Sequence, residues 1–294
     1  MNSLKERIIK YIFTILGYAS LLFLFGITVV LVKESLPAIM SLNIFSFLFG
    51  MEWYPAYEPA EYGILPLVAG SVAVSIGAAV ICVPLGIGTA LYLHELAGET
   101  QKKILKPVIE FLAAIPSIIF GFFGIVVVAP FLQKTFDLPT GLCLFTASIV
   151  MGIMAVPTVT SLSEDALSFV PRSFKEASYA LGANRWQTLT KVVIPAAGSG
   201  ISTSVILGVS RLMGETMTVL MVSGGAAMIP NSIFSPVRPM TATIAAEMGE
   251  AVQGSLHYST LFFIGLVLFM ITLGLNILSE HISKKYRLKL GQGR

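Results

Sequence analysis

Long apolar runs dominate the chain and set its architecture. A helix needs about 20 mostly apolar residues to cross the hydrocarbon core of a bilayer. The charge-free runs that reach this length are 11–32, 62–93, 111–133, 138–163 and 258–279. A further run at 192–222 is also long enough, but it contains Arg211 and Glu215. The pattern therefore predicts an all-α polytopic membrane protein with six transmembrane helices.

The composition agrees with this pattern and excludes several classes of protein. Hydrophobic residues make up 55% of the chain and charged residues 12%, whereas charged residues are about 25% of a typical soluble domain. The sequence has no P-loop motif for ATP and no His, Cys, Asp or Glu cluster with metal-ligand spacing. The net charge of +3 is too small to indicate binding to nucleic acid.

Basic residues are distributed unevenly among the connections between runs. Most of the 19 Lys and Arg residues lie in the N-terminal segment, after the second and fourth runs, and in the C-terminal segment. Cytoplasmic loops of membrane proteins carry such an excess of Lys and Arg. We therefore expect a multi-pass protein of the cell membrane with both termini in the cytoplasm.

The connection at 164–191 lies on the basic side and has helix signals of its own. An S-x-x-E motif at 173–176 fits a capping box, in which each side chain satisfies a free amide at a helix start. Gly182 suits a left-handed residue that ends this helix, and an N-x-x-Q motif at 184–187 starts another. The sequence predicts two short helices at an angle, the second of which continues through Pro195 into the fifth span.

The same connection carries a family motif. The pattern E-A-A-x3-G-x9-I-x-L-P runs through Glu176, Ala177, Ser178, Gly182 and Pro195. The mild departures from it are Ser178, Val192 and Ile194. This motif resembles the coupling loop of bacterial ABC-importer permeases, which implies that the matching residues dock into a groove of a separate cytoplasmic ATPase. The alternative is an amphipathic connector that lies on the membrane surface.

Arg211 and Glu215 place charges inside the fifth span. Residues four apart share one face of a helix, so we expect these two side chains to meet. An Arg at the centre of a bilayer costs at least about 2.5–3.5 kcal/mol, and a carboxylate partner offsets part of that cost. The pair is either a structural ion pair or part of an anion pathway, in which Glu215 holds or releases Arg211.

Other polar residues are weaker candidates for the pathway. Ser117 follows a proline in the third span, where it marks either a simple kink or a break that lines the pathway. Arg238 either guides an anion into the outer mouth, with Thr241 as a neutral donor, or lies in solvent or among lipid head groups. We expect Glu247 and Glu250 to lie on a solvated helix face or to contact a binding protein.

The fifth span also narrows the family resemblance. The segment that begins at Arg211 resembles the R-x-x-G-E-T-M-x-V stretch of phosphate-importer permeases, and the segments 115–124 and 236–245 resemble the same group. The similarity is to the PstC-type subunit, whose architecture the PstA-type subunit shares. It implies an anchor helix and outer loop at 1–62, an ABC-importer type I permease domain at 63–280 with coupling helices at about 173–191, and a cytoplasmic tail at 281–294.

The resemblance implies a permease subunit of an ATP-driven, binding-protein-dependent phosphate importer in a prokaryotic membrane. Its partners would be a homologous second permease (PstA-type), two ATPase subunits (PstB-type) that bind ATP and Mg, and an external phosphate-binding protein (PstS-type). The chain itself would need no cofactor and would not be an enzyme. The alternatives are a permease for molybdate or sulfate, a gradient-driven transporter with Glu215 as a proton site, and a membrane scaffold without transport.

Overall fold

The computed structural model describes residues 3–289, with side chains described for residues 6–281. Within this range, six helices are long and apolar enough to cross a membrane: Glu6–Ser41, Leu65–Leu96, Ser117–Thr135, Leu144–Ser168, Arg185–Met213 and Leu256–His281. The prediction of an all-α protein with six spans is confirmed. Nearly all side chains of the expected tail at 281–294 lie outside the described residues.

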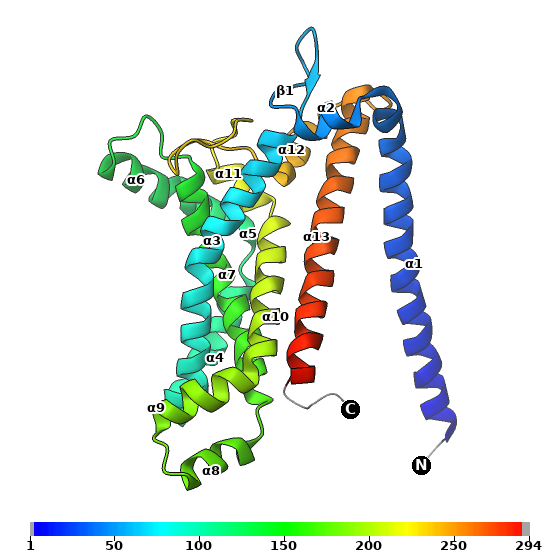
Figure 1. The fold of residues 1–294 in the computed structure, drawn as a ribbon. Coiled ribbons are helices and arrows are strands. Elements are labelled where there is room, and N and C mark those ends of the chain that lie inside the picture. Colours follow the sequence, from blue (N-terminus) through cyan, green and yellow to red (C-terminus); the bar gives the residue numbers. More distant parts are fainter. Residues whose placement is uncertain (1–2, 290–294) are drawn as a thin grey trace.

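Three helices form the centre of the bundle: α3 (Leu65–Leu91), α7 (Leu144–Ser168) and α10 (Ile194–Met213) (Figure 1). The main buried apolar cluster includes Val74, Ala78, Met151, Val159 and Leu212. Gly152 of α7 allows close approach to α3, because an added Cβ would come within 2.8 Å of Ile81 Cβ. Small residues at such contacts are typical of helix packing in membranes, where close van der Waals contact drives association.

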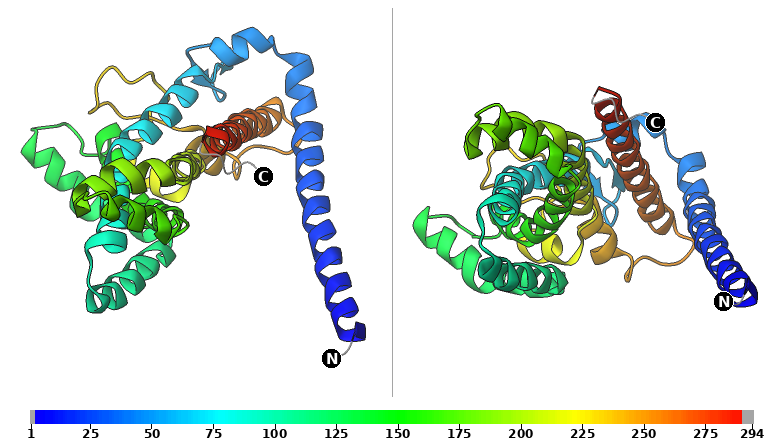
Figure 2. Two further views of the ribbon diagram at one scale, coloured as in Figure 1. Left: turned by 60° about the horizontal axis from the view of Figure 1, so that its bottom comes forward. Right: turned by 90° about the horizontal axis from the view of Figure 1, so that it is seen from below.

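The first helix lies at the edge of the molecule. α1 (Ser3–Ser41) runs beside α13 (Leu256–Lys289) and away from the central helices (Figures 1 and 2). None of its most apolar stretch is buried within the chain. Lipid or another protein must therefore cover this surface, since apolar side chains are costly to expose to water.

The two ends of the bundle carry different elements (Figure 1). One end has α2 (Ile44–Phe49), β1 (Trp53–Tyr54), β2 (Glu61–Tyr62), α11 (Met217–Val222) and α12 (Met240–Glu247). The other has α4 (Glu99–Ala114), α8 (Arg172–Ala180) and α9 (Arg185–Thr188), together with the start of α1 and the end of α13. We call them the outer and inner ends, after the orientation that the basic residues predict.

The third apolar run is not one helix, so the expected span at 111–133 is wrong at its inner end. The run is divided among α4, α5 (Ser117–Phe123), η2 (Gly124–Val128) and α6 (Ala129–Thr135). Ile115 is extended, with ψ 128°, because the residue before a proline disfavours helical backbone. Pro116 then caps α5. α4 carries Lys102, Lys103, Lys106 and Glu110 and is not among the helices apolar enough to cross a membrane, so we place it at the inner end rather than across the membrane.

π-helical turns occur within several spans. η2 lies in the third span, η1 (Tyr92–Leu96) continues α3 at the inner end, and η3 (Leu189–Val193) joins α9 to α10. A π-helical turn is rare and is often found at functional sites. The π-helical turns η1 and η3 are therefore candidate hinges between the inner end and the spans.

Candidate functional site

The connection between α7 and α10 folds as a helical hairpin at the inner end, which we call the coupling hairpin (residues 172–193). α8 begins directly after Pro171, so Ser173 lies inside the helix and the expected capping box at 173–176 is wrong. Gly182 has a φ of +81°, which agrees with the left-handed residue expected there. An added Cβ would meet nothing within 4 Å, so the backbone conformation rather than lack of space favours glycine.

One side-chain hydrogen bond joins the two arms of the coupling hairpin, and a cap fixes the start of the second arm. Ser178 Oγ lies 2.9 Å from Thr188 Oγ1, and both side chains are buried. The cap expected at Asn184 is confirmed: its Oδ1 accepts a hydrogen bond from the Gln187 amide at 2.8 Å, and the Gln187 side chain accepts from the Asn184 amide at 3.0 Å. The hairpin is therefore a preorganised unit rather than a loose connector.

The exposed surface of the coupling hairpin is rich in apolar groups. Leu181 is 89% exposed and Trp186 70% exposed. Beside them opens a groove of about 610 Å³, whose lining includes Phe174, Ala177, Leu181, Gly182 and Gln187. Glu176 is exposed on α8, and Pro195 lies in the first turn of α10. Large exposed apolar side chains beside a groove, on a connection that carries polar and basic residues, indicate a protein-binding surface.

Thr188→Val is expected to loosen the coupling hairpin. It leaves the buried Ser178 hydroxyl without its partner, which costs about 1–3 kcal/mol. Hydrogen exchange of residues 172–193 should rise, whereas the double variant Ser178→Ala/Thr188→Val should exchange more slowly than the single variant. Thr190→Val is the matched control, because the Thr190 hydroxyl bonds only to the Trp186 carbonyl one turn away within the same arm. Equal exchange in the single and double variants would contradict this account.

The fifth span ends earlier than expected, which separates Arg211 from Glu215. α10 ends at Met213, and Glu215 lies in the connection that precedes α11. The two residues do not share a helix face, and no ion pair joins them among the described residues. Instead, Arg211 Nη1 donates a 2.6 Å hydrogen bond to Thr158 Oγ1 of α7 and stays exposed. Arg211 thus offers its remaining donors to the surface of the bundle.

Ser117, Glu215 and Thr241 are brought together where α5, α11 and α12 meet. Thr241 Oγ1 donates to the backbone carbonyl of Glu215 at 2.7 Å, and Thr218 Oγ1 donates to the carbonyl of Ser117 at 2.9 Å. The Thr218 amide also donates to Glu215 Oε1 at 3.4 Å. Ser117 marks a break rather than a kink, because the helix is interrupted before it. Irregular backbone at membrane depth occurs only where protein or a water-filled cavity covers it.

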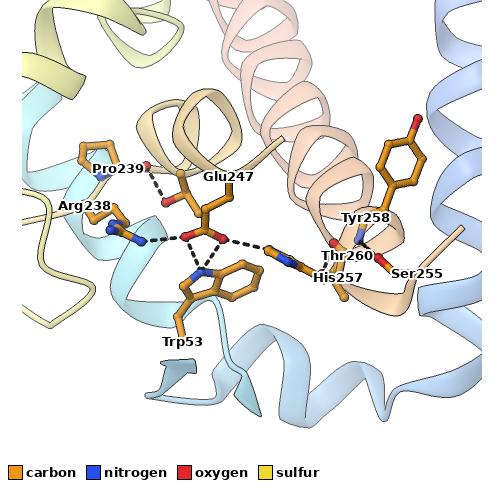
Figure 3. A network of polar contacts seen from close by, with 9 residues as sticks. Trp53, Arg238, Pro239, Glu247, Ser255, His257, Tyr258 and Thr260 are labelled. Carbon is orange, nitrogen blue, oxygen red and sulfur yellow. Dashed lines mark hydrogen bonds and ion pairs between the residues drawn. The ribbon is translucent and has the colours of Figure 1, made fainter. Parts of the chain in front are cut away.

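Arg238 and Glu247 are not free in solvent, contrary to expectation (Figure 3). Arg238 Nη1 lies 2.6 Å from Glu247 Oε1, and its Nε donates to the Gly225 carbonyl at 2.8 Å. Glu247 also accepts a 3.1 Å hydrogen bond from the indole N–H of Trp53 and lies 2.9 Å from His257 Nε2. One carboxylate therefore joins the β1 strand, the segment before α12 and the start of α13. An Arg that is paired in this way has less charge to offer a passing anion.

The sites described above offer surfaces for binding. Among the described residues, no group of three or more His, Cys, Asp or Glu side chains could hold a metal ion. The inner end carries a preorganised docking surface, and the spans carry an exposed Arg beside interrupted helices. An ionisable side chain within a membrane span marks a candidate functional site by default.

Comparison with known proteins agrees with this description. The family model for the binding-protein-dependent transport system inner membrane component matches residues 82–288. The probable ABC transporter permease protein YqgH of Bacillus subtilis is 41% identical, over 81% of this chain and 77% of its own length. The phosphate transport system permease protein PstC of Mesorhizobium japonicum is 38% identical, over 86% of this chain and 82% of its own.

Solved structures share the fold at low sequence identity. A chain of the bacterial alginate ABC transporter superposes with a TM-score of 0.66 at 14% identity, covering 96% of this chain and 95% of its own. A chain of the inward-facing MetNI methionine ABC transporter gives 0.57 at 21% identity, covering 76% of this chain and 94% of its own. The chain therefore belongs to the family of binding-protein-dependent transport system inner membrane components.

Proposed function

We propose that the chain is the permease subunit of an ATP-driven importer of inorganic phosphate. Its family membership and its similarity to PstC permeases support transport of phosphate. The observation that carries the proposal is the coupling hairpin, a rigid element with an exposed apolar surface at the inner end of a six-span bundle. Such a surface is what an ATPase needs in order to act on the spans from outside the membrane.

In the proposed assembly, the inner end of the bundle binds the ATPases and the outer end receives phosphate. Two PstB-type ATPases would bind ATP and Mg and dock on the coupling hairpins of this chain and of a PstA-type permease, which places the inner end and both termini in the cytoplasm. A PstS-type protein would deliver phosphate to the outer end. Within the spans, Arg211 would bind the anion, while Ser117, Glu215 and Thr241 line the breaks that change as the pathway opens. The permease thereby couples two distant binding events without covalent chemistry.

Gly182→Asp tests this function at the elbow of the coupling hairpin. Asp at a φ of +81° strains the backbone and places a carboxylate on the docking surface. In the complex purified with its ATPase, we expect phosphate-loaded binding protein to stimulate ATP hydrolysis about fivefold less than in wild type. Gly98→Asp is a control at the inner end, because Gly98 has a φ of −69° and open space around it.

Several outcomes would contradict the proposal. A wild-type chain that purifies alone and transports under an ion gradient would point to a secondary transporter, with Glu215 as the first residue to test. Stimulation by molybdate or sulfate rather than phosphate would assign a different oxyanion. Stimulation by phosphate that Gly182→Asp leaves unchanged would remove the coupling role of the hairpin.

A further inference from the structure

One side chain ties α8, the first arm of the coupling hairpin, to the second span. Lys175 of α8 forms an ion pair with Glu95 of η1, and its Nζ lies 3.3 Å from Nε2 of His94. The Lys175 and Glu95 side chains are 22% and 18% exposed, so the pair is largely withdrawn from solvent. Salt screens such a pair less than it screens a pair in open water.

The rest of α8 packs within its own hairpin. Its principal neighbours are α9 and η3. The backbone joins the hairpin to α7 on one side and to α10 on the other. Lys175 therefore links α8 to α3, a span that the chain order does not connect to the hairpin.

The η1 turn, which carries Glu95, is also held by α4, and α4 in turn contacts α7. Lys102 Nζ of α4 donates to the His94 carbonyl at 3.3 Å, and Lys106 Nζ lies 2.8 Å from Glu164 Oε2 of α7. The hydrogen bond to Glu164 raises the pKa of Lys106 above its ordinary value, which further stabilises the ammonium form. Glu95 and His94 lie in a π-helical turn, where the regular helix already gives way to another geometry. Movement of Lys175 would therefore displace Glu95 at the end of α3, where the helix is already irregular.

We propose that the Lys175–Glu95 ion pair transmits movement of the coupling hairpin to α3, which makes both residues positioning residues for transport. The inference rests on the proposed function, because an ATPase must move the hairpin. It specifies that movement of α8 reaches α7 and α10 through the backbone and α3 through this ion pair. The ion pair acts in addition to the buried apolar cluster that Leu189 and Val193 of the second arm share with Ala90 of α3. Breaking the pair should leave docking intact and should disconnect hydrolysis from transport.

The test uses the complete complex in proteoliposomes, with ATP hydrolysis and phosphate uptake measured in the same vesicles. Lys175→Glu and Glu95→Lys should each lower phosphate transported per ATP hydrolysed by about fivefold, while the ATPase still co-purifies. The exchanged double variant Glu95→Lys/Lys175→Glu should return to within about twofold of wild type, and Lys175→Arg should stay there. Lys103→Glu makes the same charge change on an exposed residue of the inner end, and it should leave the ratio unchanged.

The outcomes separate this inference from the proposed function. Wild type without phosphate-stimulated hydrolysis would overturn the proposed function. Normal stimulation in wild type together with an unchanged transport ratio in both single variants would overturn the ion-pair link alone. A loss that the exchanged pair fails to restore would also overturn it, because the individual side chains and not their pairing would then be responsible.

Discussion

Arg211→Ala is expected to lower phosphate uptake by about 10- to 100-fold, while the complex still assembles. A hydrogen bond to a charged group contributes about 1.5–3 kcal/mol, and each 1.4 kcal/mol corresponds to about tenfold. Arg211 is exposed on α10, with one of its donors occupied by Thr158, and no carboxylate neutralises it among the described residues. Its planar fork matches the oxygens of phosphate. Uptake of labelled phosphate into proteoliposomes measures the effect.

Two further variants separate the roles of charge and geometry at this position. Arg211→Lys keeps the charge but loses the two-pronged contact, so uptake should fall less than in Arg211→Ala. Thr158→Val removes the group that orients the guanidinium, and it should reduce uptake while leaving the charge in place. If Arg211→Ala lowers the unfolding temperature but not uptake, Arg211 is a structural residue and the pathway runs elsewhere.

Glu247→Ala is expected to destabilise the outer end by about 3 kcal/mol, because it leaves charged and polar partners without their acceptor. Arg238, His257 and the indole of Trp53 all contact this one carboxylate. The chain has two Trp residues, so Trp186→Phe leaves Trp53 as the sole tryptophan reporter. Trp53 is 2% exposed. On heating, unfolding of the outer end should shift the fluorescence of Trp53 to longer wavelength. This shift should occur at a lower temperature in Glu247→Ala/Trp186→Phe than in the Trp186→Phe parent.

The control for this experiment is Glu250→Ala. Glu250 is exposed in the turn that follows α12, and its side chain takes part in no ion pair among the described ones. We expect it to change stability by less than about 0.5 kcal/mol. Equal effects of the two substitutions would mean that net charge at the outer end, and not the Glu247 contacts, sets its stability.

The sequence predicts the spans well because a bilayer imposes a strong and simple requirement. Any helix that crosses it needs a long apolar run, so the runs are visible without knowledge of tertiary contacts. The coupling hairpin is similarly accessible, because Gly182 and Asn184 act through local backbone geometry. The sequence was less informative about helix ends inside apolar runs, where Pro116 and Gly214 interrupt helices that hydrophobicity would continue.

Contacts between distant segments account for what the sequence could not predict. Arg211 and Glu215 suit a helical pair by spacing, yet the chain leaves the helix at Gly214 and Arg211 finds Thr158 on another span. Trp53 and His257 gave no local signal, because their partner Glu247 lies in a different segment. The one feature that pointed to this network is a Trp in an outer loop, because an indole N–H needs an acceptor when it is buried.

The network at Glu247 also bears on the order in which the chain is made. Its hydrogen bond to Trp53 joins residues 194 positions apart, and His257 lies at the start of the last membrane helix. The N-terminal part of a protein emerges first during synthesis. The Trp53 indole therefore lacks this acceptor while the next four spans are made and inserted into the membrane. Closure of the outer end thus coincides with arrival of the final helix. A chain cut short before residue 247 would lack the acceptor that the Trp53 indole has in the complete outer end.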